Sequence, residues 1–291
     1  MPRVGVLTSA DGFWSERVRE AGGKAMTLPL PNAPLLRGVA LRREWMSDWA
    51  QTSFHGQRVG ETVDALLVDS AEPARLAGLL VAALRLDLPV VVATPLRDPF
   101  AIALAAMGFA PLAGEPVEVA VEVALDGGPR PRELVEGFSL ANALRAGLAS
   151  GAGPELLVHL AAIAREAGTV GFGQMIRVLS PESPALADFA SSSFEASEVF
   201  ARLALHDTRT VAGRLREALP HVSEEPPPGD HAGPRLALVR GRFSGTEAVC
   251  LTSDRIAEVF GECRVFSTEE EAVRVVTDGG VGPGDLLVVA G

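Results

Sequence analysis

The sequence is poor in positive charge and contains almost no lysine. Lysine and arginine together number 26 and aspartate and glutamate 37, which gives a formal net charge of −11. A nucleic-acid-binding surface requires clustered positive charge, so this balance argues against a nucleic-acid partner. Lys24 is the only lysine of the chain. Schiff-base or carbamate chemistry on a buried lysine is therefore restricted to that one residue.

Cysteine is also scarce, since Cys250 and Cys263 are the only two thiols. They are too few for a disulfide framework or for a four-thiolate iron–sulfur cluster within one chain. We predict that both are ordinary small apolar side chains. The five histidines show no HxxxH spacing, and the chain has no GxGxxG, P-loop or GxSxG motif.

Long hydrophobic runs are absent as well. The most apolar stretch, residues 79–93, is interrupted by Arg85, Asp87 and Pro89 and is too short to span a bilayer. Residues 1–9 are typical of a strand, not of a signal peptide. We therefore expect a cytoplasmic protein with no membrane partner.

The 291 residues are 47% hydrophobic, which is ample for a sizeable core and for about two domains. In the first hundred residues, short apolar strands alternate with helical patterns. This pattern is typical of a parallel sheet covered on both faces. The strands are expected at 4–7, 25–28, 65–68 and 90–93, and the helices at 14–21, 42–52 and 75–86.

Helical patterns dominate from about residue 98 to residue 219. Helices are expected at 132–148, 155–167, 172–179 and 208–219, and residues 115–125 fit either a helix or a strand. Ser180-Pro181 is a helix stop signal. The segment 221–234 contains Pro226-Pro-Pro-Gly229 and reads as an exposed linker. A small β-rich unit follows, with strands at 236–239, 248–251, 264–266 and 286–289 and a helix at 269–276.

These patterns predict an α/β fold, with a parallel sheet flanked by helices and a small, truncated β-rich domain of partial-barrel type at its C-terminal side. The predicted division is an α/β domain at 1–220, a linker at 221–234 and the β-rich domain at 235–291.

Polar side chains follow several of the predicted strands. In an open parallel sheet, the carboxyl ends of the strands line the ligand crevice. The residues at these ends form the predicted ligand-binding set, which is Ser9, Asp11, Asp69, Ser70 and Thr94. Glu72 lies nearby and is a candidate catalytic carboxylate. The alternative is that Asp69 or Ser70 caps the helix that begins at Pro73.

His159 lies on the apolar face of the predicted helix 155–167. We interpret it as a hydrogen-bonded core or interface histidine, not as a ligand.

Four segments of the chain resemble the dihydroxy-acid dehydratase / phosphogluconate dehydratase family, in the order in which the family has them. They are Gly78–Pro89 with the following Val-Val-Val, Val158–Gly168, Ser180–Asp188, and Arg264–Val273 together with Pro283–Val289. The resemblance implies a two-domain dehydratase in which an iron–sulfur cluster and a magnesium ion act as Lewis acids. A loop that resembles Gly241–Gly245 bears the family's catalytic base, which makes Ser244 a candidate base. A plain turn is the alternative there.

The metal ligands that the resemblance implies are missing from the matching positions. Ala71-Glu-Pro-Ala74 stands where the family has Asn-Cys-Asp-Lys, and Gly153-Pro-Glu155 replaces Ser-Thr-Asn. No cysteine precedes Cys250, and no acidic residue lies between Lys24 and Arg43. Thiolates are needed to hold such a cluster and hard carboxylates to hold magnesium. We therefore expect no iron–sulfur cluster and no magnesium ion.

The sequence thus predicts a shortened dehydratase-family protein that has lost metal-dependent dehydration. It retains at most binding of a small hydroxy acid or sugar acid, or a partner role as a homodimer or with a full-length paralogue. The alternative is an active hydro-lyase that works by an altered, cluster-independent mechanism. The resemblance places either version in branched-chain amino acid or sugar-acid metabolism.

Overall fold

The structure is a computed structural model of the chain, and its contacts divide it into two compact units, Met1–Thr252 and Ser253–Gly291. Within them the structure describes residues 1–9, 12–31, 38–55, 63–112, 114–183, 186, 199–200, 203, 205–211, 213–214, 235–240, 247–252 and 261–289. The predicted linker at 221–234 lies outside these ranges. The predicted domain boundaries therefore stay a prediction.

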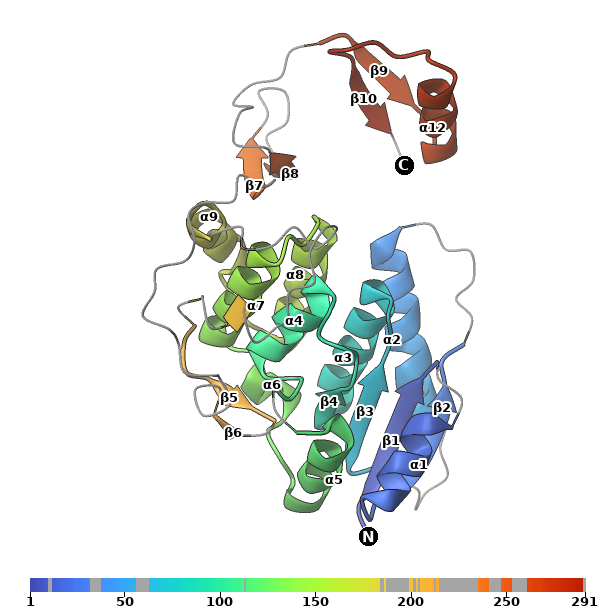
Figure 1. The fold of residues 1–291 in the computed structure, drawn as a ribbon, viewed down its shortest axis with the longest axis vertical. Helices are drawn as coiled ribbons and strands as arrows, with labels where there is room; N and C mark the ends of the chain where they lie inside the picture. Colours follow the sequence, from blue (N-terminus) through green and yellow to red (C-terminus); the bar gives the residue numbers. More distant parts are fainter. Residues whose placement is uncertain are drawn as a thin grey trace. The chain divides into compact units, whose positions relative to one another are not determined.

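A four-stranded parallel sheet forms the centre of the first unit (Figure 1). The strands are β1 (Arg3–Thr8), β2 (Lys24–Pro29), β3 (Ala65–Asp69) and β4 (Val90–Val92), in the order β2-β1-β3-β4. The direction of winding reverses between β1 and β3, where Thr8 lies opposite Asp69. The predicted parallel sheet is confirmed. The apolar strands β1, β3 and β4 are buried on both faces, whereas the edge strand β2 is partly exposed.

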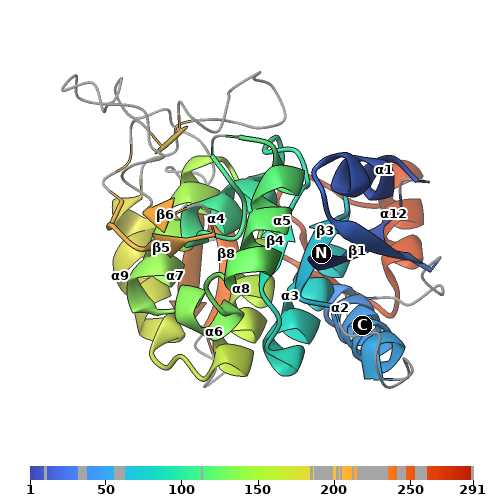
Figure 2. The same ribbon diagram turned by 90° about the horizontal axis from the view of Figure 1, so that it is seen from below.

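Helices cover both faces of this sheet (Figure 2). The helices α1 (Phe13–Glu20) and α5 (Pro116–Asp126) contact the strands from one side, and α2 (Val39–His55) and α3 (Pro73–Leu86) pack together on the other. Residues 115–125 thus belong to a helix, and the alternative of a strand is wrong. Its apolar residues meet the sheet at a helical spacing, with Val117, Ala120 and Val121 buried.

A second group of helices lies beyond the β4 edge of the sheet (Figure 2). It comprises α4 (Pro99–Met107), α6 (Pro131–Leu134), α7 (Gly137–Ala149), α8 (Glu155–Ala167) and α9 (Phe172–Glu182). Every residue of α4 after Pro99 is buried, because α7 packs against it and β4 lies beside it. The α4 helix begins at Asp98, whose carboxylate accepts hydrogen bonds from the amides of Phe100 and Ala101.

Two helix boundaries differ from the sequence-based expectation. The predicted helix 132–148 is two helices, because Ser139 Oγ accepts a hydrogen bond from the amide of Glu136 and also donates to Leu134 O, which starts a new helix at Gly137. The α9 helix continues through Pro181, although Ser180-Pro181 was predicted to end it. Proline removes the backbone donor that would bond to Arg177 O, and the helix ends one residue later, at Glu182.

The predicted helix 208–219 is also wrong for the part that the structure describes. Residues Arg209–Thr210 (β5) and Gly213–Arg214 (β6) form a short antiparallel pair. Tertiary contacts explain the difference. The side chain of Asn142 binds both backbone groups of His206 at 2.8 Å, and the amide of Val211 donates to Gly108 O.

The last strands occur where the sequence predicts them. The strands β7 (Arg235–Arg240) and β8 (Glu247–Thr252) form an antiparallel pair. This pair contacts α9, where Ser180 Oγ donates a hydrogen bond to Leu236 O. In the second unit, β9 (Cys263–Phe266) and β10 (Leu286–Val289) are parallel and connected by α12 (Glu269–Thr277). Thr268 caps α12. The partial barrel stays a prediction, because this unit shows one βαβ element within its described residues.

A cluster of charges joins α2, α3 and α8 at their outer surface. The guanidinium of Arg85 lies 3.4 Å from Glu44, 3.3 Å from Asp48 and 3.1 Å from Glu166, and it also donates to Ser47 Oγ. Burial alone would raise the pKa of Glu44. The hydrogen bond and charge of Arg43, with those of Arg85, outweigh that effect and hold its pKa below the ordinary value.

Replacing Arg85 by methionine should lower the free energy of unfolding by about 1–2 kcal/mol, because three carboxylates then lose their shared partner while the apolar stem is kept. Urea unfolding at pH 7 measures this loss. Arg19→Met on the exposed surface of α1 is the matched control and should change the midpoint little. An equal effect of the two substitutions would mean that the cluster contributes nothing beyond an ordinary surface arginine.

Candidate functional site

Three residues of the predicted ligand-binding set meet at the carboxyl edge of the sheet. Asp69 accepts hydrogen bonds from Trp14 Nε1 at 2.8 Å and from Thr94 Oγ1 at 3.3 Å. The amide of Ser70 donates to Thr94 Oγ1 at 3.1 Å. The exposed Ser9 follows β1, whose last residue pairs with Asp69. The structure therefore brings Asp69, Ser70 and Thr94 together, while the role of the predicted set in ligand binding stays a prediction.

Asp11 and Ser244 lie outside the described residues, so nothing is said of their positions. Glu72 is described, and its carboxylate lies 3.2 Å from Arg42 Nε and 2.7 Å from Arg75 Nε. These two cations neutralise its charge, which does not favour a free catalytic carboxylate at this position.

Neither Asp69 nor Ser70 is the N-cap of α3, which corrects the capping alternative. The N-cap is Glu72, and its side chain makes no capping bond. Both carboxylate oxygens of Asp69 instead accept hydrogen bonds, Oδ2 from Trp14 Nε1 and Oδ1 from Thr94 Oγ1. Ser70 instead accepts a hydrogen bond from the amide of Glu72 through Oγ, at 3.2 Å, just before the helix begins.

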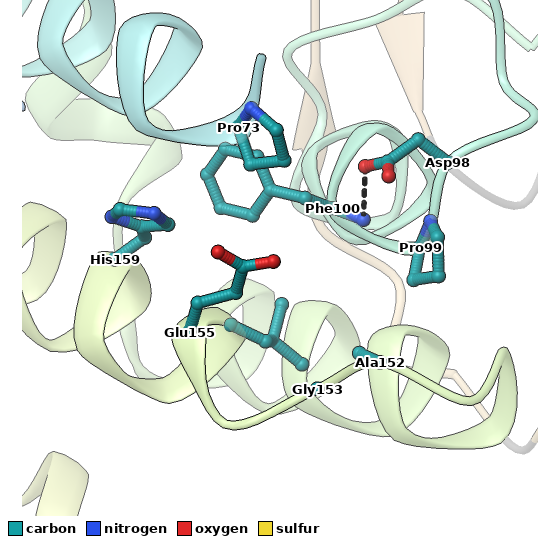
Figure 3. Close-up of a pocket in the computed structure, with 9 residues that line it drawn as sticks. Pro73, Asp98, Pro99, Phe100, Ala152, Gly153, Glu155 and His159 are labelled. Atoms are coloured by element: carbon teal, nitrogen blue, oxygen red, sulfur yellow. Dashed lines mark hydrogen bonds between the residues drawn. The ribbon is translucent and has the colours of Figure 1, made fainter. Parts of the chain in front are cut away.

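A cavity of about 150 Å³ lies where α3, α4 and α8 begin (Figure 3). Pro73 opens α3, Asp98 and Pro99 open α4, and Glu155 opens α8. The complete lining is Pro73, Asp98, Pro99, Phe100, Ala152, Gly153, Glu155, Leu156 and His159. Three helix N-termini therefore contribute partial positive charge to one small space.

Carboxylates offset this partial positive charge. Asp98 uses one oxygen to cap α4, and Glu155 is an exposed carboxylate in the first turn of α8. Glu72 stands directly before α3. Among the described residues that line the cavity there is no lysine and no arginine. The cavity wall thus offers hydrogen-bond acceptors on an otherwise apolar surface.

His159 forms part of the cavity wall and is completely buried. Neither Nδ1 nor Nε2 has a hydrogen-bond partner among the residues that the structure describes, and the ring lies against Phe100 with 5.4 Å between the ring centroids. Burial lowers the pKa of His159 to about 4, and the positive charges of Arg43 and Arg42 on α2 contribute to this shift. The imidazole is therefore neutral near pH 7, with one N–H donor and one acceptor nitrogen.

The sequence-based interpretation of His159 was right about its burial and wrong about its hydrogen bonding. The apolar face of α8 predicted a core position, and the side chain is indeed buried. A buried polar group without a partner is rare and costs free energy. Asp98 and Glu155, which line the same cavity, were not singled out. The available signals were their positions at the starts of α4 and α8 and, for Glu155, the segment 153–155 that the family resemblance had matched.

The cavity brings together positions that the family resemblance matched to metal-binding motifs. Pro73 stands within the segment 71–74, and Gly153 and Glu155 within the segment 153–155. Proline and glycine offer no side-chain ligand, and no thiol is among the described residues that line the cavity. Within the part of the chain that the structure describes, no three His, Cys, Asp or Glu residues are grouped to hold a metal ion. This donor set does not fit an iron–sulfur cluster.

The thiols lie elsewhere in the sequence. Cys263 at the start of β9 is a free, exposed cysteine. The side chain of Cys250 lies outside the described residues. No described helix is long and apolar enough to cross a bilayer.

The chain is distantly similar to dihydroxy-acid dehydratases. It is 30% identical over 197 residues to "Dihydroxy-acid dehydratase" of Akkermansia muciniphila, covering 58% of this chain and 35% of that protein. The "Dihydroxy-acid dehydratase" of Synechococcus sp. (strain RCC307) is 28% identical over 209 residues, which cover 61% of this chain and 36% of that protein. That of Thermosynechococcus vestitus is 25% identical over 187 residues, or 55% and 33%.

The chain thus spans about a third of the length of the curated relatives that it matches. No protein-family model matches it. The similarity supports a relationship to the dehydratases and leaves their activity to be tested on this chain.

Proposed function

We propose that this chain binds a small hydroxy acid or sugar acid in the cavity at the starts of α3, α4 and α8, and that it does so without metal-dependent dehydration. The observation that carries the proposal is the donor set of the cavity. It lies between segments matched to the dehydratase motifs, yet its wall presents two carboxylates and a neutral imidazole in place of thiolates.

Each part of the cavity has a role in binding. Glu155 and the free oxygen of Asp98 accept hydrogen bonds from hydroxyl groups, and His159 both donates and accepts. Phe100, Leu156 and the two prolines present apolar surface for the carbon chain and exclude water. Because Asp98 also caps α4, its carboxylate is held in place before a ligand arrives.

An accessory role is the second proposal that follows from the similarity. The chain would pair with a second copy or with a full-length paralogue, and its core would preserve the contact surface. The matched segment covers about a third of each relative, so a chain that shares only part of such an enzyme and pairs with it is consistent with the matched share.

Metal and sulfide analysis of anaerobically purified protein tests the loss of the cluster. We expect less than about one tenth of an equivalent of iron or acid-labile sulfide, because holding a cluster takes about four thiolates. The same preparation is then screened by thermal shift against small hydroxy acids and sugar acids, with the matching acids that lack hydroxyl groups as controls. Stabilisation by the hydroxylated compounds alone is expected.

Stoichiometric iron and sulfide with visible absorbance would overturn the loss of the cluster. Absence of stabilisation by every hydroxylated compound would overturn ligand binding. Turnover of a hydroxy acid that survives chelators would favour the cluster-independent hydro-lyase instead, with Glu155 and His159 as its acid and base candidates. Co-purification of a full-length paralogue would support the accessory role.

A further inference from the structure

We infer that the cavity receives the hydroxyl-bearing end of its ligand, bound by Glu155 and His159, and that any carboxylate of the ligand stays outside. This inference rests on the proposed function and names the part of the ligand that the site recognises. Its consequence is that a neutral polyol binds in place of the acid.

The charges around the cavity favour hydroxyl groups over a carboxylate. The ionisable groups of its lining are Asp98, Glu155 and His159, and the imidazole is uncharged near pH 7. A ligand carboxylate placed inside would meet two like charges, and no cation among the described lining residues would offset them. Hydroxyl groups meet no such penalty, because they donate to carboxylate oxygens.

The nearest cations are committed to other partners. Arg42 and Arg75 pair with Glu72, and Arg43 pairs with Glu44 and donates to Val158 O. Arg42 and Arg43 repel a proton on His159, while the carboxylates of Asp98 and Glu155 line the same cavity. Burial chiefly keeps the imidazole neutral, and the charges of Arg43 and Arg42 add to this effect, so His159 does not serve as a cation for an incoming anion.

The ring of His159 offers a second binding group for a hydroxyl. It is completely buried in the cavity wall, and both of its nitrogens lack a partner. Figure 3 shows the ring of His159 and the carboxylate of Asp98 on opposite sides of the cavity, with Glu155 between them. A hydroxyl group is donor and acceptor at once and therefore satisfies either ring nitrogen. Because Glu155 is exposed, its side chain can change rotamer at small cost and admit a ligand to the ring.

The apolar lining matches the carbon chain of a polyol. Pro73, Pro99 and Phe100 offer flat apolar surface beside these acceptors. A polyol presents C–H groups along its chain and hydroxyl groups at its edges, so the two kinds of surface match. The volume of about 150 Å³ restricts the ligand to a short carbon chain.

Three probes with the same number of carbons distinguish recognition of the hydroxyl groups from recognition of the carboxylate. Erythronate carries hydroxyls and a carboxylate, erythritol only hydroxyls, and butyrate only a carboxylate. Binding is followed by the NMR signals of the His159 ring, assigned by comparison with His159→Gln. We expect erythritol to bind within about tenfold of erythronate, and butyrate to leave these signals unmoved.

Calorimetry of erythronate binding at pH 6 in two buffers of different ionisation enthalpy counts the protons taken up. No uptake is expected when hydroxyls meet a neutral imidazole. Uptake approaching one proton per ligand, with affinity rising as the pH falls, would show that the carboxylate enters and would overturn the inference. If the carboxylate enters, the proposed function of the cavity stands and only the inference about the hydroxyl-bearing end fails. If none of the three probes binds, the inference and the proposed function are both overturned.

Two variants test the contact with His159. His159→Leu removes both ring nitrogens and should weaken erythritol binding about tenfold, which corresponds to one lost hydrogen bond of about 1.4 kcal/mol. His159→Gln keeps a donor and an acceptor and should restore part of that affinity. His206→Gln changes an exposed histidine that packs against Phe138 and should change nothing. Unchanged affinity in His159→Leu, with a folded protein by circular dichroism, would exclude the contact.

Discussion

Replacing Gly78 by alanine is expected to lower the free energy of unfolding by about 2–3 kcal/mol, the upper range for overpacking a tight contact. Gly78 lies in α3 at its contact with α2. A Cβ atom there would stand 2.5 Å from the backbone oxygen of Arg43 and 2.8 Å from Met46 Cβ. Alanine normally stabilises a helix by about 1 kcal/mol relative to glycine, so the clash must exceed that gain. Urea denaturation measures the loss as a lower midpoint at constant slope.

Gly173→Ala is the matched control for Gly78→Ala. Gly173 also lies inside a helix, α9, and a Cβ atom there would meet nothing within 4 Å. Here the helix propensity acts alone, and stability should rise by up to about 1 kcal/mol. Opposite signs for the two glycines would establish that α2 and α3 approach each other along a backbone contact. A stabilising Gly78→Ala would refute that close approach.

Stability should fall by about 2 kcal/mol between pH 7.5 and pH 5 because of His159 alone. The ordinary pKa of histidine is 6.5, and burial lowers that of His159 in the folded protein to about 4. Over this pH range the unfolded chain takes up a proton that the folded chain resists. The stability is therefore fully present above about pH 6.5 and is lost as the pH falls toward 4. Urea unfolding at a series of pH values measures the slope.

Glutamine at position 159 cannot titrate, so His159→Gln should flatten this part of the pH profile even if its stability at pH 7.5 differs. His206→Gln should keep the wild-type slope, because the exposed His206 is not a buried, unpartnered ring. Measurements stop at pH 5 so that carboxylates such as Glu44, whose pKa lies below its ordinary value, contribute little. Parallel profiles for wild type and His159→Gln would show that His159 carries a partner or is open to water.

The periodicity of apolar residues was sufficient to predict most of the first unit. Val4–Leu7, Ala65–Val68 and Val90–Val92 are uninterrupted apolar runs, and such runs are buried strands of a parallel sheet. The Gly168 C-cap likewise placed the end of α8 correctly, because its φ of 81° favours glycine. The failures occurred where contacts distant in sequence outweigh local preference. Asn142 holds the backbone of residue 206, and a helix predicted from residue 208 gave way to β5 and β6.

The candidate site was predicted only in part. Strand ends pointed to Asp69, Ser70 and Thr94, which the sheet does bring together. The cavity at the starts of α3, α4 and α8 was not foreseen. Pro73, Asp98 and Glu155 are typical helix-start residues, and the family resemblance at 71–74 and 153–155 indicated only missing ligands there. The unpaired state of His159 was equally hidden, since periodicity indicates burial and says nothing of hydrogen-bond partners.

The amino-acid sequence by itself determined the α/β class, the parallel sheet and the shortage of thiols, because these depend on composition and on spacing along the chain. The order β2-β1-β3-β4, the neutral imidazole in the cavity wall and the pairing of Glu72 with Arg42 were decided only by the tertiary structure. Each of these depends on groups far apart in sequence that the folded chain brings together, and no local sequence pattern indicates which groups those are.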